Sequence, residues 1–136
     1  MIKPIMKSEF FLRLPSEDAG PDDAATGQDL LDTLHEHGHE CVGLAANMIG
    51  VRKRIICVKD GNRTLLMYNP QILEQVNAYQ TSEGCLSLIG ERPCTRYRRI
   101  KVEYLDENFV HRIKNFSGYT AEIIQHEIDH CNGIVI

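Results

Sequence analysis

The sequence lacks the features that would place the protein in a membrane or on nucleic acid. None of its 136 residues belongs to a stretch long and apolar enough to span a bilayer. Lys3, Lys7 and Glu9 interrupt the apolar N-terminus, so no signal peptide is visible. The net charge is -4 and there is no long basic run, which argues against a nucleic-acid partner. These absences predict a cytoplasmic protein.

The sequence also lacks a pattern of cysteines that is typical of a disulfide framework. There are five cysteines, an odd number, and they are scattered along the chain. In a reducing compartment we expect them to be buried thiols, and any exception to be a metal ligand. The five are Cys41, Cys57, Cys85, Cys94 and Cys131.

Length and composition are typical of one globular domain with its own hydrophobic core. Helical spacing of leucines predicts a helix over 24–37, and Asn69-Pro70 is expected to end a strand. Alternation and turn residues predict strands at 54–58, 64–68, 71–76, 98–105 and 109–116. The predicted fold is a single α+β domain, residues 1–136, with small antiparallel sheets packed around a C-terminal helix.

The C-terminal helix carries the strongest motif, because residues 125–130 read Gln-His-Glu-Ile-Asp-His and contain HExxH. Residues four apart lie on one face of a helix, so His126 and His130 could bind one metal ion. Glu127 could then act as a base towards a metal-activated water. Ser117 is the expected N-cap of this helix. The alternative is an amphipathic helix that carries two histidines by chance, and the metal site is the favoured interpretation.

Two imidazoles rarely complete a metal site, and Cys85 is the natural third ligand. It follows a glycine in an expected loop. One thiolate and two imidazoles would leave a fourth position open, as in catalytic sites. Two alternatives stay open: Cys85 is a small buried hydrophobe, or Cys94 or Cys131 is the ligand. Cys131 is the weaker choice because it points about 100° away from its neighbour His130 on the helix.

Three motifs in this order resemble those of the peptide deformylase family. Residues 41–48 resemble the family's glycine-hydrophobic-glycine-hydrophobic-Ala-Ala-x-Gln motif, 83–87 match Glu-Gly-Cys-Leu-Ser, and 125–130 match its HExxH motif. The resemblance spans nearly the whole chain. It implies a deformylase fold and removal of the N-formyl group from the N-terminal methionine of nascent polypeptides. The implied partners are formyl-Met peptides, with the ribosome as a further candidate.

The resemblance also implies a metal set and an acid–base group. Cys85, His126 and His130 would bind one divalent metal, typically Fe(II), with Zn, Ni or Co able to occupy the site. Glu127 would take a proton from the metal-activated water and later give it to the leaving amine.

The remaining implied roles concern the substrate. The Leu86 backbone N–H would stabilise the developing oxyanion. The backbone groups of Val42 and Gly43 would pair with the peptide as an added strand. Arg92 would lie near the mouth of the groove.

Two positions depart from the family pattern. Cys41 stands where the first glycine is usual, and Met48 stands where the family has a glutamine whose amide helps to hold the formyl oxygen. Methionine has no N–H to donate, and losing one oxyanion donor can cost about 3 kcal/mol, or about a hundredfold in rate. We therefore expect an enzyme that is slow or altered in specificity.

Three alternatives follow from the motifs. One is a non-catalytic or weakly active relative that binds formyl-peptides or the ribosome, another is a different HExxH metallopeptidase, and the third is a structural metal site. The intact Glu127 argues against the first alternative, and the intact Glu-Gly-Cys-Leu-Ser motif argues against the second. The third would need a fourth protein ligand.

Overall fold

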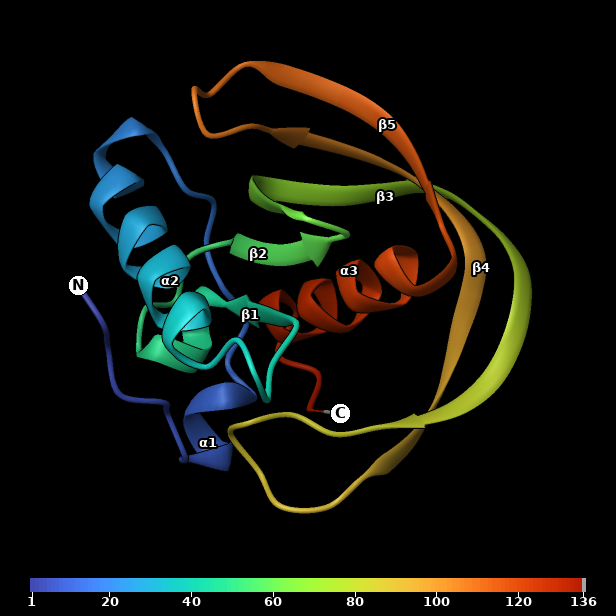
Figure 1. The fold of residues 1–136 in the computed structure, drawn as a ribbon, viewed down its shortest axis with the longest axis horizontal. Coiled ribbons are helices and arrows are strands. Elements are labelled where there is room, and N and C mark those ends of the chain that lie inside the picture. Colours follow the sequence, from blue (N-terminus) through green and yellow to red (C-terminus); the bar gives the residue numbers. More distant parts are fainter. Residues whose placement is uncertain (136) are drawn as a thin grey trace.

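The computed structural model, which describes residues 1–135, contains one five-stranded antiparallel sheet that curves around a C-terminal helix (Figure 1). In chain order the elements are α1 (Glu9–Leu12), the 3₁₀ helix η1 (Pro21–Asp23), α2 (Ala24–Glu36), β1 (Gly43–Ala45), the 3₁₀ helix η2 (Ala46–Ile49), β2 (Ile55–Asp60), β3 (Arg63–Glu83), β4 (Arg92–Leu105), β5 (His111–Ser117) and α3 (Gly118–Cys131). Each strand pairs with the next in sequence. The predicted α+β class is confirmed, with the strands joined in one sheet. None of the described helices is long and apolar enough to cross a bilayer.

The second strand of the sheet, β2, is buried on both faces, and it separates two parts of the hydrophobic core. Ile55 and Cys57 face the first cluster, whereas Ile56 and Val58 face the second, as the alternation of side chains along a strand requires. The first cluster lies against α2, through Leu30 and Leu34, and the second lies against α3. Helices on both faces of β2 therefore fix the position of α3 relative to the sheet.

Helix α3 forms where the sequence predicted it, because one stripe of apolar residues at helical spacing packs on the sheet. Ser117 occupies the N-cap position, although its side chain makes no capping hydrogen bond. At the other end Gly133 has φ +76, and a Cβ there would lie 2.5 Å from the Arg13 carbonyl oxygen. Only glycine fits this turn. The buried stripe consists of Ala121, Ile124, Ile128 and Cys131.

Strand β3 differs from the prediction, because it continues through Asn69-Pro70 to Glu83 instead of ending there. The pairing with β4 shifts register between Tyr68 and Gln71, and Asn69 adopts φ 54. This bulge accommodates a proline that cannot donate to the ladder. The Asn69 side chain also exchanges two hydrogen bonds with the Ala19 backbone, at 2.7 and 2.9 Å. The long strand consequently wraps around α3 and brings its end to the helix (Figure 1).

Candidate metal centre

Three side chains from two separate segments meet beside α3. Cys85 comes from the loop after β3, and His126 and His130 come from consecutive turns of α3. Their ligand atoms lie within 4.8 Å of one another, and the two Nε2 atoms are 3.2 Å apart. Metal–nitrogen bonds of about 2.0–2.1 Å at a tetrahedral angle separate two nitrogens by about 3.3 Å, so the imidazoles fit one ion. Within residues 1–135 this cluster contains three ligands, which fits a site with an open position better than a closed structural one.

The charges of these groups also suit a cation. Burial would raise the pKa of the Cys85 thiol, but hydrogen bonds from His126 and from backbone amides lower it. Burial would lower the pKa of His126, but its hydrogen bonds to Cys85 and Glu83 raise it to about 10. The environment thus favours a thiolate on Cys85 beside a positive charge, and a divalent cation would supply that charge. Burial lowers the pKa of His130 to about 3, which keeps its lone pair free.

Glu127 lies on α3 directly after the first histidine, and its side chain is only 4% exposed. Burial raises the pKa of this carboxyl to about 7. Its Oε1 has no hydrogen-bond partner among the described residues. A buried carboxylate oxygen without a partner is costly for a fold. This oxygen is therefore suited to meet a ligand or a reacting group.

Gly43 on β1 gives this carboxylate its space. A Cβ at Gly43 would lie 3.0 Å from Glu127 Oε2 and 2.7 Å from Ile123 Cγ2. The contact with Ile123 is shorter than real Cβ atoms make and the one with Glu127 is tighter than most, so a side chain at this position would displace Ile123 and crowd Glu127. The glycine is required here for close packing of strand against helix.

A buried ionic network supports the ligands. The Nδ1 of His126 lies 2.8 Å from Glu83 Oε1, and Arg96 donates to both oxygens of Glu83 at 2.7 to 3.1 Å. Arg96, which is 4% exposed, also donates to Asp129 Oδ2 at 2.7 Å. A carboxylate that holds the second nitrogen of a ligating histidine fixes the ring and its tautomer. Arg96 consequently ties β3, β4 and α3 together around the cluster.

Sequence reasoning assigned no role to this network. Glu83 was visible as the first residue of the Glu-Gly-Cys-Leu-Ser motif, two positions before the cysteine. Arg96 was hidden in a strand that contains four arginines, Arg92, Arg96, Arg98 and Arg99. The signal in the sequence was the alternation along this strand, which places Arg96 on the inward face. A buried arginine there needs an acidic partner.

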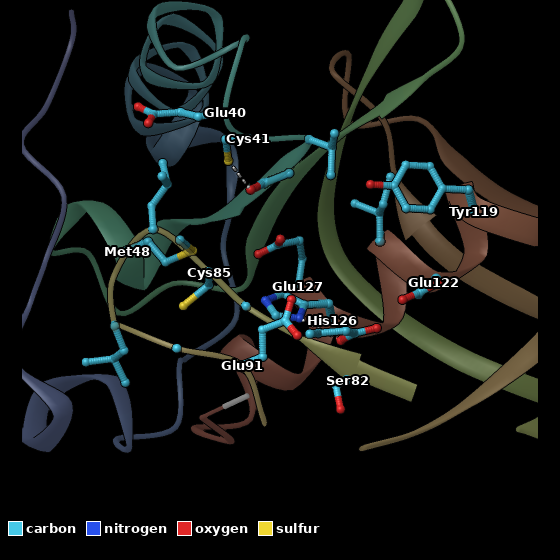
Figure 2. Close-up of a pocket in the computed structure, with 18 residues that line it drawn as sticks. Glu40, Cys41, Met48, Ser82, Cys85, Glu91, Tyr119, Glu122, His126 and Glu127 are labelled. Carbon is cyan, nitrogen blue, oxygen red and sulfur yellow. Dashed lines mark hydrogen bonds and ion pairs between the residues drawn. The ribbon is translucent and has the colours of Figure 1, made fainter. Parts of the chain in front are cut away.

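A pocket of about 570 Å³ opens above these groups (Figure 2). It lies between β1, the loop of residues 84–91 and α3. The lining includes most of the residues that the motifs singled out, namely Val42, Gly43, Met48, Cys85, Leu86, His126 and Glu127. His130 lies deeper and is fully buried. The fold thus gathers residues from all three motifs on one cavity.

Arg92, which we expected near the mouth of the groove, is not among the lining residues. It begins β4 and is the cross-strand partner of Glu83. Its guanidinium lies 3.7 Å from the Glu9 carboxylate on α1. The side chain is therefore directed to the N-terminal arm, and a position of Arg92 near the mouth of the groove stays a prediction.

Met48 lines the pocket as an apolar side chain and is 1% exposed. It belongs to the first core cluster, against which Cys85 and Leu86 pack, and Figure 2 shows its thioether near Cys85. The adjacent Asn47 does not supply the missing amide, because its Nδ2 donates to the His130 carbonyl at 2.9 Å. This wall of the pocket therefore presents sulfur where the family motif has an amide.

Leu86 is held from outside the pocket by the N-terminal arm. The Lys7 ammonium donates to the Leu86 carbonyl. The Met6 N–H donates to the Met48 carbonyl at 2.7 Å. The N-terminal arm thus contacts both Leu86 and Met48, which pack near Cys85. These contacts limit rotation of the Leu86 peptide group.

Comparison with known proteins agrees with these features. A family model described as polypeptide deformylase matches residues 7–136. The chain is 52% identical over 136 residues to a peptide deformylase of Clostridium beijerinckii, and the match covers all of both chains. It is 38% identical over 111 residues to peptide deformylase 1 of Clostridium perfringens, covering 79% of this chain and 74% of that one.

Solved structures give the same result. The class I type b peptide deformylase of Acinetobacter baumannii, bound to Met-Ala-Ser, matches with a TM-score of 0.89 at 28% identity and covers 99% of this chain and 97% of that chain. The peptide deformylase of Thermus thermophilus matches with a TM-score of 0.86 at 32% identity, covering 99% of this chain and 83% of that chain. Sequence and fold agree over nearly the whole length, so the chain belongs to the peptide deformylase family, as its motifs predicted.

Proposed function

We propose that this chain hydrolyses the formamide at the N-terminal methionine of polypeptides, releasing formate and a free amino terminus. One observation carries the proposal: a buried carboxylate with a free oxygen lies beside a three-ligand cluster on the floor of a pocket. Membership of the deformylase family supports the same reaction. We propose that residues 1–136 act as a single catalytic domain.

Cys85, His126 and His130 would hold the metal. A divalent ion bound there supplies Lewis acidity, which activates water and polarises a carbonyl group. One thiolate and two imidazoles suit Fe(II), Zn, Ni or Co rather than Mg or Ca. We propose Fe(II) as the native metal, with Zn, Ni or Co able to occupy the same ligands.

Glu127 moves the proton. Its buried carboxylate accepts a proton from the attacking water as the new C–O bond forms at the formyl carbon. The same carboxyl then gives this proton to the amine nitrogen as the C–N bond breaks. A pKa of about 7 suits both transfers, because neither protonation state is then strongly disfavoured.

The pocket walls orient the substrate. The Leu86 N–H donates to the formyl oxygen as negative charge develops there. The edge of β1 at Val42 and Gly43 pairs with the peptide as an added strand, through the outward-facing backbone groups of Gly43. Met48 contributes an apolar wall and no donor, so we expect a lower rate than an amide at this position would allow.

The proposed substrates are formyl-Met chains as they leave the ribosome, which makes the ribosome a proposed partner. The proposed location is the cytoplasm, where such chains are made. No direct contact with nucleic acid is proposed, since the chain carries a net charge of -4.

The test is formate release from formyl-Met-Ala-Ser by the purified protein, loaded anaerobically with Fe(II). We expect turnover in the natural chain and a loss of at least about a hundredfold in Glu127→Gln, because an amide cannot accept the proton. The variant should keep its metal, measured by elemental analysis. The matched control is Glu36→Gln, an exposed residue at the end of α2 that does not line the pocket. Full activity in Glu127→Gln would show that Glu127 is not the base. If the natural chain releases no formate, the proposed reaction is refuted.

A further inference from the structure

The open edge of β1 carries an internal hydrogen bond at the place where a peptide would pair. β1 pairs with β2 alone and is the first strand of the sheet. The Val42 carbonyl accepts from the Lys59 N–H at 2.9 Å, so it points towards β2. Carbonyls alternate in direction along a strand. The Gly43 carbonyl therefore points to the open edge, on the pocket side.

The Cys41 side chain is hydrogen-bonded to this outward-facing carbonyl. Its Sγ–H donates to the Gly43 oxygen at 2.9 Å, and Figure 2 shows this contact at the rim of the pocket. Burial raises the pKa of the Cys41 thiol to about 12, so the group keeps the proton that it donates. The family motif has glycine at this position, which has no side chain to do so.

The pocket beneath this edge is built to receive a ligand. Cys41, Gly43 and Glu127 all line it, and Glu127 Oε1 is buried without a partner among the described residues. A peptide that enters as an added strand brings backbone N–H groups to the carbonyls of the open edge. Cys41 and the incoming peptide thus present donors to the same oxygen.

We propose that the Cys41 thiol is an internal competitor for the Gly43 carbonyl, and that it sets the affinity of this protein for the peptide backbone of its substrates. The inference rests on the proposed function. A thiol is a weak donor, so a peptide N–H displaces it at small cost. The sulfur must also rotate away from the edge before a peptide strand can approach. Cys41 therefore acts on binding and not on the chemical step.

The test is a donor series at position 41 in the metal-loaded protein: Cys41→Ala removes the donor, and Cys41→Ser strengthens it. The readouts are the Kd for Met-Ala-Ser by calorimetry, and KM and kcat for formyl-Met-Ala-Ser. We expect both Kd and KM to fall about threefold with alanine and to rise about threefold with serine, as weak and ordinary hydrogen bonds predict. The value of kcat should stay within about twofold.

The order of the Kd values for alanine, cysteine and serine at position 41 distinguishes competition from a structural role. If alanine and serine shift Kd in the same direction, or if neither shifts it, the inference is wrong. Thermal unfolding of each variant reports whether it is folded, and Cys41→Gly, with the residue of the family motif, replaces alanine if Cys41→Ala is not. Absence of formate release from the natural chain would refute the proposed function. Turnover with an unchanged Kd across the series would refute only the role of Cys41.

Discussion

The wall of the pocket formed by α3 is held by buried charges, whereas the wall formed by residues 41–48 is held by apolar packing and backbone contacts. Glu83, Arg96 and Asp129 link three elements around the ligands through hydrogen bonds of 2.7 to 3.1 Å. Across the pocket, Met48 is packed into the core. Both departures from the family motif, at positions 41 and 48, lie on this second wall. A charged network leaves little freedom to substitute, because each member left alone would be an unpaired buried charge.

The largest effect should come from Cys85, the candidate ligand in the loop between the two walls. Cys85→Ser should release soft and borderline metals and reduce turnover to background, because a neutral hydroxyl replaces a thiolate. Metal content by elemental analysis measures the first effect and formate release the second. Cys94→Ser is the matched control and should keep its metal. Loss of metal from the Cys94 variant alone would overturn the choice of Cys85 as ligand.

The next effect should come from the network behind the ligands. Arg96→Met removes the guanidinium that Glu83 and Asp129 share, which should cost about 3 kcal/mol of unfolding free energy. Metal affinity should fall by about tenfold to a hundredfold, because Glu83 without Arg96 orients His126 less firmly. Urea unfolding and competition with a chelator measure the two quantities. The control is Arg98→Met, which removes an exposed arginine over the Tyr79 ring. Equal effects in both variants would show that the buried network does not support the metal site.

A smaller effect is expected at Met48, on the apolar wall. Met48→Gln restores an amide of nearly the same length, so turnover should rise by about tenfold, or roughly 1.4 kcal/mol of transition-state binding. The measurement is kcat/KM for formyl-Met-Ala-Ser with the metal content matched. A fall in both rate and stability would instead mean that the wall is repacked around methionine and cannot satisfy a buried amide.

The smallest effect should come from the N-terminal arm, which contacts Leu86 and Met48. Lys7→Ala removes the hydrogen bond to the Leu86 carbonyl, and because this lysine is exposed we expect only about a twofold loss in kcat/KM. Lys114→Ala on β5 is the control for loss of one surface charge. A loss above about tenfold would show that the arm holds Leu86 far more tightly than an exposed hydrogen bond can.

The sequence was sufficient for the helix and for the meeting of its two histidines, because helical spacing places His126 and His130 on one face without any knowledge of the fold. It was not sufficient for β3. The proline at position 70 predicted a strand end, and the structure replaces that end by a bulge that Asn69 secures through a contact with Ala19. A local rule was overridden by a partner about fifty positions away, which no short window can reveal.

The same limit applies to the pocket. The pairing of Arg96 with Glu83 and Asp129 depends on the register of β3 with β4 and on the docking of α3, and neither can be read from spacing. The contact of Arg92 with Glu9 could not be predicted for a related reason, because Glu9 lies on an arm whose path the motifs do not describe. Spacing alone predicted the contact within α3 but not these contacts between elements.

The loop that joins β3 to β4 has a further consequence for how the protein folds and opens. Cys85 lies at the tip of this long hairpin, and the histidines lie on the last helix, so an ion bound by all three would act as a cross-link between two distant parts of the chain. Its removal by a chelator should loosen the hairpin tip first. Amide hydrogen exchange should then accelerate over 84–91 while β2, buried on both faces, remains protected.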